Sequence, residues 1–317
     1  MVRLAATAPS IHNAQPARWR SVVGGLEIAA DLSVRLPQAD PEGAGVALSV
    51  GAAVEATVLA LSRSDVAAEV TPLWAGDDAR SWPGHRMAAR LTLSDGAPLP
   101  LADQLEARFT WRGRFETAPP RLFGWTRGDT VMVLDEDGRG ALAALNDEAS
   151  LRILRGKAFR QELLGWMRLT TRHPRYRFDG LSRAALRLSP RDAKSVKLGL
   201  GPLWPLLDWA GRAEALVAEA PLTMSAPLIA LFHAPRGADP METGRGYLRM
   251  WLEATALGLA GWPMAALSDD AEARAEVEAR FPMPEGHRLV QALRFGVPTG
   301  DRPPRFRRAI EEVLSDG

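Results

Sequence analysis

Two stretches of this sequence are apolar on nearly every face when they are drawn as helices, and they resemble each other. Val46–Leu61 contains EATVLAL at 55–61, and Tyr247–Ala260 contains EATALGL at 253–259. A helix that is apolar all round is buried inside a fold and does not lie on its surface. The pattern indicates either a duplicated unit whose two central helices pack together or a chance likeness between two alanine-rich helices.

The remaining pattern predicts an α+β chain with two unequal halves. A short strand pattern follows each apolar helix, and a composition shift near Ser94–Pro100 marks the expected boundary. Thr171–Pro190 lacks clear periodicity and predicts a long loop, of a length typical of lids and binding loops. The other predicted elements are strands at Met87–Leu93, Leu228–Phe232 and Leu289–Phe295, a hairpin at Arg18–Ile28 that turns at Gly24-Gly25, a short helix at Val2–Ala8, and one or two helices at Ala141–Thr170.

The composition excludes several classes of protein and site. The 317 residues are 46% apolar and 24% charged with a formal charge of +1, so the chain is globular and has no electrostatic footprint for nucleic acid. Cysteine is absent, which excludes disulfides, thiolate catalysis and thiolate metal sites. The most apolar stretch, Ala254–Leu267, is shorter than the roughly 20 residues of a membrane span, and Met1–Ala8 lacks the apolar core of a signal peptide. We therefore expect a cytoplasmic protein without membrane or nucleic-acid partners.

Almost all basic residues are arginines, and many gather in two motifs. Lysine occurs only at 157, 194 and 197, a bias that favours forked contacts to anions and that GC-rich coding also produces. In RFTWRGRF at 108–115, an extended backbone points Arg108, Thr110, Arg112 and Arg114 to one face, where they could hold a phosphate. On spacing alone, a solvated strand or loop face explains this motif better. RPPRFRR at 302–308 could close over the same phosphate.

A polar turn lies near the N-terminus. APSIHNAQP at 8–16 places four polar side chains between Pro9 and Pro16, which restrict the backbone. Such a turn suits the polar edge of a flat ligand. It also suits a capped helix end, in which Ser10 or Asn13 satisfies free amide groups, and the residues alone favour this second interpretation.

The histidines predict no metal site. His85, His233 and His287 lie far apart in the sequence without the spacing of metal ligands, so each is expected to be isolated. His12 lies inside the polar turn, where it either faces a ligand or stabilises the turn.

Taken together, these motifs resemble a known family. APSIHNAQP, RFTWRGRF, the helix EATALGLAGWP, the strand RFGVP and the terminal PRFRR occur in the order seen in the nitroreductase superfamily of FMN-dependent oxidoreductases. More specifically, the chain resembles the Acg-like branch, in which two nitroreductase-type halves are fused, and the resemblance covers Val2–Val313. It implies an α+β nitroreductase-like fold that forms an internal pseudo-dimer, with halves at 1–98 and 99–317 and a lid insertion near 171–190.

The resemblance also implies which residues hold the FMN phosphate. Arg108 and Thr110 would meet the phosphate, with Thr110 in place of the family's usual serine. Arg112 would approach the ribityl and pyrimidine side. Arg305 or Arg307 matches the terminal arginine on the phosphate, and the sequence does not decide which.

Further residues match the surroundings of the flavin ring. The family lines the flavin with the polar turn of the partner half, here Pro9, Ser10 and Asn13. A family proline lies beneath the ring and backbone amides face the reactive nitrogen, and the matching residues here are Pro263, Ala265 and Ala266. The lid either covers the flavin and meets an anionic substrate or cofactor phosphate, or is merely a basic loop, and its residues of interest are His173, Arg175 and Tyr176.

The sequence departs from the family pattern at three points. The usual QPW is extended to QPARW at 15–19, which puts the equivalence of Trp19 in doubt. Ala265-Ala266 replaces a frequent Glu-Gly, so a carboxylate is lost while backbone contacts survive. The arginine motif and the polar turn each occur once, which fits one flavin per pseudo-dimer.

The resemblance thus implies an FMN-dependent oxidoreductase. It would pass reducing equivalents from NADH or NADPH through the flavin to a nitroaromatic, a quinone or a related small molecule, without a catalytic side chain. The alternative is a flavin-binding or storage protein whose lid blocks turnover. In both cases we expect a monomeric pseudo-dimer.

Overall fold

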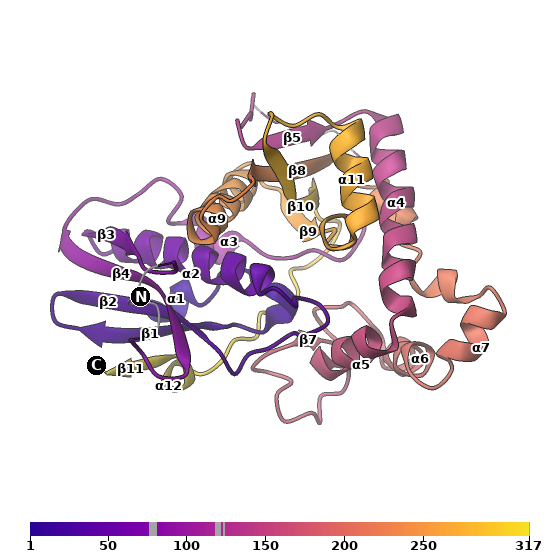
Figure 1. Cartoon of the computed structure of the whole chain (residues 1–317), viewed down its shortest axis with the longest axis horizontal. Coiled ribbons are helices and arrows are strands. Elements are labelled where there is room, and N and C mark those ends of the chain that lie inside the picture. Colours follow the sequence, from indigo (N-terminus) through magenta and orange to yellow (C-terminus); the bar gives the residue numbers. More distant parts are fainter. Residues whose placement is uncertain (76–80, 118–121, 123, 317) are drawn as a thin grey trace.

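Two sheets and a central pair of helices organise the chain (Figure 1). The computed structural model describes residues 1–75, 81–117, 122 and 124–316. Helices and strands are mixed along the whole of this part, which confirms the predicted α+β class. One sheet comes mainly from the N-terminal part of the chain, and the other comes from residues 130–296.

The first sheet has the strand order β11-β1-β2-β4-β3. Its strands are β1 (Ala17–Val22), β2 (Gly25–Asp31), β3 (Val66–Pro72), β4 (His85–Asp95) and β11 (Leu314–Asp316). All neighbours are antiparallel except β1 and β11, which pair in parallel with Trp19 opposite Leu314. The C-terminal end of the chain therefore returns to the N-terminal sheet.

The second sheet has the strand order β5-β8-β10-β9 and is antiparallel throughout. Its strands are β5 (Thr130–Val133), β8 (Leu228–Pro235), β9 (Ala260–Pro263) and β10 (His287–Gly296). A separate two-stranded pair consists of β6 (Met167–Arg168) and β7 (Leu181–Ser182), which closes the base of the loop at 171–180.

The helices vary widely in length. The long ones are α2 (Ala44–Ser62), α4 (Glu136–Arg155), α5 (Lys157–Trp166), α6 (Pro190–Leu200), α9 (Pro240–Ala256) and α11 (Ala271–Arg280). The short ones are α1 (Val2–Ala5), α3 (Gln104–Ala107), α7 (Trp204–Trp209), α8 (Ala220–Thr223), α10 (Ala266–Asp269) and α12 (Ile310–Val313), with 3-10 turns at η1 (Ile11–Asn13) and η3 (Ala213–Leu216).

The central helices α2 and α9 pack against each other, as the duplicated-unit interpretation requires. They cross at Gly51 and Gly244, where a Cβ on Gly51 would lie 2.9 Å from the Gly244 Cα. Beside the crossing, the buried carboxylate of Glu55 pairs with Arg245 at 2.9 Å and Arg249 at 2.6 Å. Glycine permits this close approach because it has no side chain. The duplication itself stays a prediction.

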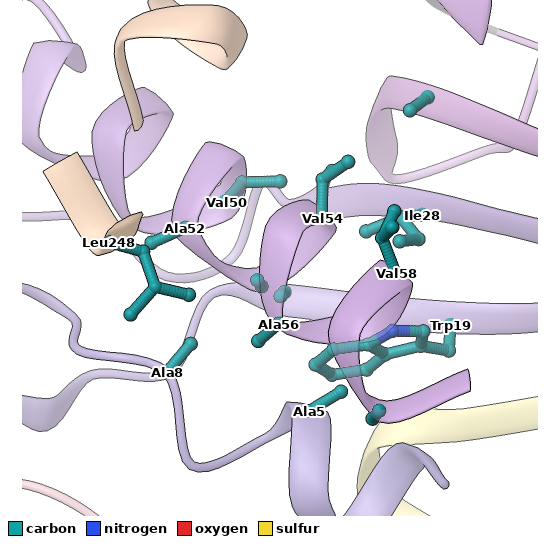
Figure 2. Close-up of a cluster of buried hydrophobic side chains, with 14 of the residues drawn as sticks. Ala5, Ala8, Trp19, Ile28, Val50, Ala52, Val54, Ala56, Val58 and Leu248 are labelled. Atoms are coloured by element: carbon teal, nitrogen blue, oxygen red, sulfur yellow. The ribbon is translucent and has the colours of Figure 1, made fainter. Parts of the chain in front are cut away.

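Helix α2 forms the core above the first sheet. Figure 2 shows its Val54 and Val58 beside Ile28 of β2, with Trp19 of β1 at the same interface. Trp19 is buried and its Nε1 donates to Thr57 Oγ1 at 2.9 Å. By length and composition α2 could cross a membrane, but 78% of its apolar window is buried in the protein. The sequence predicts Ala254–Leu267 as the most apolar stretch, but the 19-residue core helix α2 is a longer apolar segment.

Several element boundaries differ from the prediction. Helix α9 begins at Pro240, behind the capping side chain of Asp239, and ends at Ala256 before the left-handed Gly258. The predicted window Tyr247–Ala260 therefore starts too late, because Asp239-Pro240 is a helix start signal. It also ends too late, because it continues past Gly258, a helix stop signal. The stretch 141–170 contains two helices that begin at residue 136 and end at 166, and the first helix ends at Ala5.

Candidate functional site

Arginines from two distant motifs meet at one backbone oxygen. Arg108 Nη2 donates to the Thr7 carbonyl at 2.6 Å, and Arg307 Nη2 donates to the same oxygen at 3.0 Å. Arg305 donates to the backbone carbonyls of Arg108 and, at 3.1 Å, of Glu106. The fold therefore brings Arg108 together with both arginines of the tail that matched the family pattern.

This arginine cluster (Arg108, Arg305, Arg307) is rich in unbalanced positive charge. Among the described residues, none of the three forms an ion pair with a carboxylate. Burial, followed by repulsion from neighbouring arginines, lowers the pKa of each guanidinium to about 9. Buried charges are costly unless they are paired, so the cluster has the electrostatic character of an anion site. The Arg108 guanidinium makes only the Thr7 hydrogen bond among the described residues, which leaves donors for an anion.

The segment that follows Arg108 runs beside strand β9. Thr110 forms a parallel bridge with Gly261, and the Trp111 amide donates to the Gly261 carbonyl at 3.0 Å. Strand β9 ends at Pro263, and Ala265 and Ala266 then begin α10, where the first amides of a helix have no intrahelical partner. The expected phosphate-binding and ring-facing residues thus lie on neighbouring backbone segments.

Arg112 belongs to a second charged group and not to the arginine cluster. Its Nη1 donates to Ala185 O at 3.3 Å, and burial lowers its pKa to about 10 against the attraction of Glu219. Glu219 Oε2 accepts from Arg294 Nη2 at 3.0 Å. The Trp262 ring lies 3.4 Å from the guanidinium carbon of Arg294 and 5.9 Å from that of Arg112. Asp147 also interacts electrostatically with Glu219 and Arg294, so the two cations of this group face two carboxylates.

Arg294 and Glu219 were not among the site residues predicted from the sequence. Arg294 is completely buried in strand β10 among the buried Ala292, Leu293 and Phe295, and an arginine inside such an apolar run is a signal, because a buried charge needs a partner. Its partner Glu219 lies 75 residues earlier in the chain, and no spacing pattern connects the two.

The polar turn adopts an unusual backbone. His12, Asn13 and Gln15 have positive φ angles of 47°, 55° and 53°, a region that non-glycine residues rarely enter. Ser10 Oγ accepts from the Gln15 amide at 3.1 Å and so stabilises the turn itself. Asn13 Oδ1 accepts from Arg307 Nη1 at 3.0 Å, which ties the turn to the arginine cluster. Strain of this kind is typical of functional sites.

His12 lies in this turn with its imidazole neutral. Burial, with a further contribution from Arg112, lowers the pKa of His12 to about 4. Its Nε2 is buried without a hydrogen-bond partner among the described residues. This orphaned ring nitrogen fits a site that receives a polar ligand, because buried polar atoms are usually paired.

A network of ion pairs clasps the loop at 171–180 to the C-terminal tail. The buried carboxylate of Asp179 pairs with Arg168 at 2.9 Å, Arg175 at 3.0 Å and Arg308 at 3.1 Å. Arg175 and Arg308 also contact Glu312 at 2.9 and 3.6 Å. Because the same tail carries Arg305 and Arg307, the loop is fastened next to the arginine cluster. We call these five side chains the clasp.

The residues that the sequence predicts to lie in a lid contact other parts of the protein. Tyr176 is buried, with its ring 5.5 Å from that of Phe306. Arg175 belongs to the clasp, and its amide donates to His173 Nδ1 at 3.1 Å. At the base of the loop, Asn13 Nδ2 donates to the Gly180 carbonyl at 3.1 Å. Any role of His173, Arg175 or Tyr176 toward a ligand stays a prediction.

Two of the three histidines that we expected to be isolated are in contact. His233 Nδ1 and His287 Nδ1 lie 2.9 Å apart, because the antiparallel pairing of β8 and β10 puts His233 opposite Leu289, two residues from His287, so the histidines are diagonal neighbours. The expectation failed because the sequence does not specify strand pairing. In the described part of the chain, no group of three His, Asp or Glu residues is arranged to hold a metal ion.

Comparison with known sequences gives one local similarity. No family model matches the chain. A segment of 62 residues is 42% identical to a protein of Mycobacterium tuberculosis, found in strains CDC 1551 and H37Rv, that is provisionally named an NAD(P)H nitroreductase. The match covers 20% of this chain and 18% of the relative, so the chain spans less than a fifth of the length of the curated relatives it matches. This local similarity agrees with the motif resemblance. The assignment to the Acg-like branch and the fusion of two halves stay predictions.

Solved structures of flavoproteins are similar at a lower level. An FMN- and NADPH-dependent nitroreductase variant from Sphigopyxis sp. strain HMH has 22% identity and a TM-score of 0.38, with 68% of this chain and 98% of that chain covered. Iodotyrosine deiodinase bound to FMN has 19% identity and a TM-score of 0.37, over 66% and 95% of the chains. A BluB-like flavoprotein from Clostridium difficile 630 has 13% identity and a TM-score of 0.39, over 68% and 98%. These values are too low to carry function to this chain.

Proposed function

We propose that this protein is an FMN-dependent oxidoreductase of the nitroreductase type. It would pass reducing equivalents from NADH or NADPH through the flavin to a nitroaromatic, a quinone or a related small acceptor. The observation that carries the proposal is the arginine cluster, which gathers Arg108, Arg305 and Arg307 without a bonded carboxylate in the described part of the chain. The local identity to a provisionally named NAD(P)H nitroreductase supports the same assignment.

The residues present suit the phosphate of FMN. Guanidinium groups form short, charge-assisted and often bidentate hydrogen bonds with phosphate. A phosphate would also supply negative charge beside the buried Arg108 and the half-buried Arg305 and Arg307, so binding would remove an electrostatic penalty. Thr110 adds a hydroxyl on the segment beside β9.

Other residues would orient the flavin and tune its environment. Pro9, Ser10 and Asn13 lie on the strained turn that is bonded to the arginine cluster. Pro263, Ala265 and Ala266 supply an apolar wall and unpaired amides at the start of α10. Arg112 is a buried cation suited to stabilise negative charge. FMN itself supplies the hydride chemistry when it is bound.

The absorbance of the purified protein tests the proposal. After reconstitution with FMN, we expect a yellow protein whose colour bleaches when NADH or NADPH is added without oxygen, and returns with a quinone or nitroaromatic acceptor. A protein that binds no FMN under these conditions would refute the proposed function.

The alternative function is flavin binding or storage behind a closed lid. The clasp favours it, because three arginines converge on the buried Asp179 and hold the loop against the tail. In that case FMN binds and the colour persists in excess NADPH. We further propose that the protein is cytoplasmic and works as a monomeric pseudo-dimer on small molecules, with halves at 1–98 and 99–317.

A further inference from the structure

Exposed large apolar side chains are most concentrated in one short segment of this protein. In the described part of the chain, eleven such side chains are exposed, and five of them lie between residues 198 and 216. These five are Leu198, Leu203, Leu206, Trp209 and Leu216. Single exposed apolar residues are ordinary, whereas a gathering of this kind marks an interaction surface.

The exposed side chains belong to a helical lobe outside both sheets. Helices α6 and α7 lie at the edge of the molecule, beyond α4 and away from the central pair α2 and α9 (Figure 1). The lobe has its own small core, in which Leu200, Trp204 and Val217 pack beside Leu154 of α4. The exposed residues are therefore not needed to fill that core.

Helix α7 presents two opposite faces. Trp204 is buried and lies beneath the Arg160 guanidinium at 4.4 Å. Leu206 and Trp209, three residues apart and thus on one side of the helix, are 60% and 85% exposed. Leu203, just before the helix, is 43% exposed. We call Leu198, Leu203, Leu206 and Trp209 the apolar tip.

Basic side chains accompany the apolar tip. Lys194 and Lys197 are exposed on α6, next to Leu198, and are two of only three lysines in the chain. Among the described residues, neither forms an ion pair, and the same is true of the exposed Arg191 and Arg212. The carboxylates of this segment are partly engaged: Asp192 caps α6, Asp208 pairs with Arg155 at 3.4 Å, and Glu214 is exposed.

We propose that the apolar tip and its lysines form a docking surface for an anionic lipid bilayer. Exposed tryptophan and leucine side chains insert at the boundary between headgroups and acyl chains, and basic residues beside them attract anionic headgroups. A second copy of this chain suits the surface less well, because a symmetric contact would bring the basic residues of both copies together. The contact is peripheral and needs no membrane-spanning segment. It differs from the expectation from the sequence, which predicts no membrane partner.

Vesicle co-sedimentation tests this surface with the intact protein. We expect binding to vesicles of phosphatidylcholine mixed with phosphatidylglycerol, and much weaker binding to phosphatidylcholine alone. Replacing Leu206 and Trp209 together by serine should lower the partition coefficient by roughly tenfold or more, because their apolar area no longer inserts. Lys194→Gln with Lys197→Gln should lower it by roughly tenfold, and only for the anionic vesicles.

Matched controls separate the tip from general surface properties. Val23→Ser removes a fully exposed apolar side chain from the turn between β1 and β2, and Arg3→Gln removes an exposed cation from α1, so neither should change partitioning. The replaced side chains are exposed, and unchanged thermal unfolding would show that the variants fold. Absence of binding to anionic vesicles, or binding that the tip variants retain, would overturn the proposal. A dimer in light scattering that the Leu206/Trp209 variant abolishes would also overturn it in favour of a second copy. None of these measurements depends on FMN.

Discussion

Arg108 is the residue on which the proposed cofactor site depends most. It is buried, and its guanidinium lies over the ring of Trp251 at 4.8 Å and makes one hydrogen bond, to the Thr7 carbonyl, among the described residues. Its burial carries the desolvation cost of a cation that has no bonded counter-ion among the described residues. A side chain in this state gains more from an anionic ligand than an exposed arginine of the same motif.

We expect Arg108→Ala to weaken FMN binding by about 1.5–3 kcal/mol, the range for hydrogen bonds to charged groups. Titration of the apoprotein, followed by flavin fluorescence, measures the affinity. Arg114→Ala is the matched control, because Arg114 belongs to the same motif but is exposed. Equal affinities for Arg108→Ala and wild type, with normal folding, would place the phosphate elsewhere.

The contact between His233 and His287 predicts a loss of stability in acid. Burial, followed by repulsion from His287 and opposed by Asp129, lowers the pKa of His233 below its ordinary value. The unfolded chain therefore takes up a proton at higher pH than the folded chain, so stability falls as pH drops below about 6.5.

His287→Gln should make this part of the pH profile flatter, since it removes the repulsion. Chemical denaturation between neutral and mildly acidic pH measures the profile, with His85→Gln as the control, because His85 lies in the other sheet. A wild-type profile no steeper than that of the His287 variant would contradict the assignment.

At the scale of elements, the clasp ties the loop at 171–180 to the C-terminal tail. Asp179 is buried and receives three arginines, so its removal leaves unpaired cations, which is strongly destabilising for a local contact. Loops that cover a reaction site often limit turnover. A variant that breaks the clasp therefore distinguishes the two proposed functions, oxidoreductase and flavin storage.

We expect Asp179→Asn to speed proteolytic cleavage within 171–180 and to change the rate of flavin reduction by NADPH only modestly. Stopped-flow bleaching measures this rate, with Asp95→Asn, at an exposed carboxylate, as the control. A variant that turns from inert to readily reduced would favour storage. Unchanged proteolysis would show that Asp179 does not hold the loop.

At the scale of the whole molecule, the arginine cluster is assembled from three distant parts of one chain. The N-terminal turn supplies the Thr7 carbonyl, the segment after α3 supplies Arg108, and the tail supplies Arg305 and Arg307. These motifs each occur once, so the chain can build only one such cluster.

We therefore expect one FMN per chain and a monomeric protein in solution without lipid. Flavin absorbance against protein concentration gives the stoichiometry, and light scattering gives the mass. Two flavins per chain would contradict the single shared site and the pseudo-dimer interpretation.

The amino-acid sequence by itself determined the local features of this protein. Apolar windows located α2 and most of α9, alternating or short apolar runs located β4, β8 and β10, and paired glycines located the turn of the first hairpin. These features follow from the chain's own periodicity and turn residues, which act over a few positions. The motif resemblance also predicts Arg108 and either Arg305 or Arg307 as phosphate-binding residues, which stays a prediction.

Only the tertiary structure decided which distant residues meet. The choice of strand partners placed His233 against His287, the return of the tail put Arg308 on Asp179, and packing gave the buried Arg294 its partner Glu219. The physical reason is that such contacts depend on how buried surfaces and charges are satisfied across the whole fold. Sequence spacing carries no record of that choice, because residues up to about three hundred positions apart become neighbours only when the chain closes.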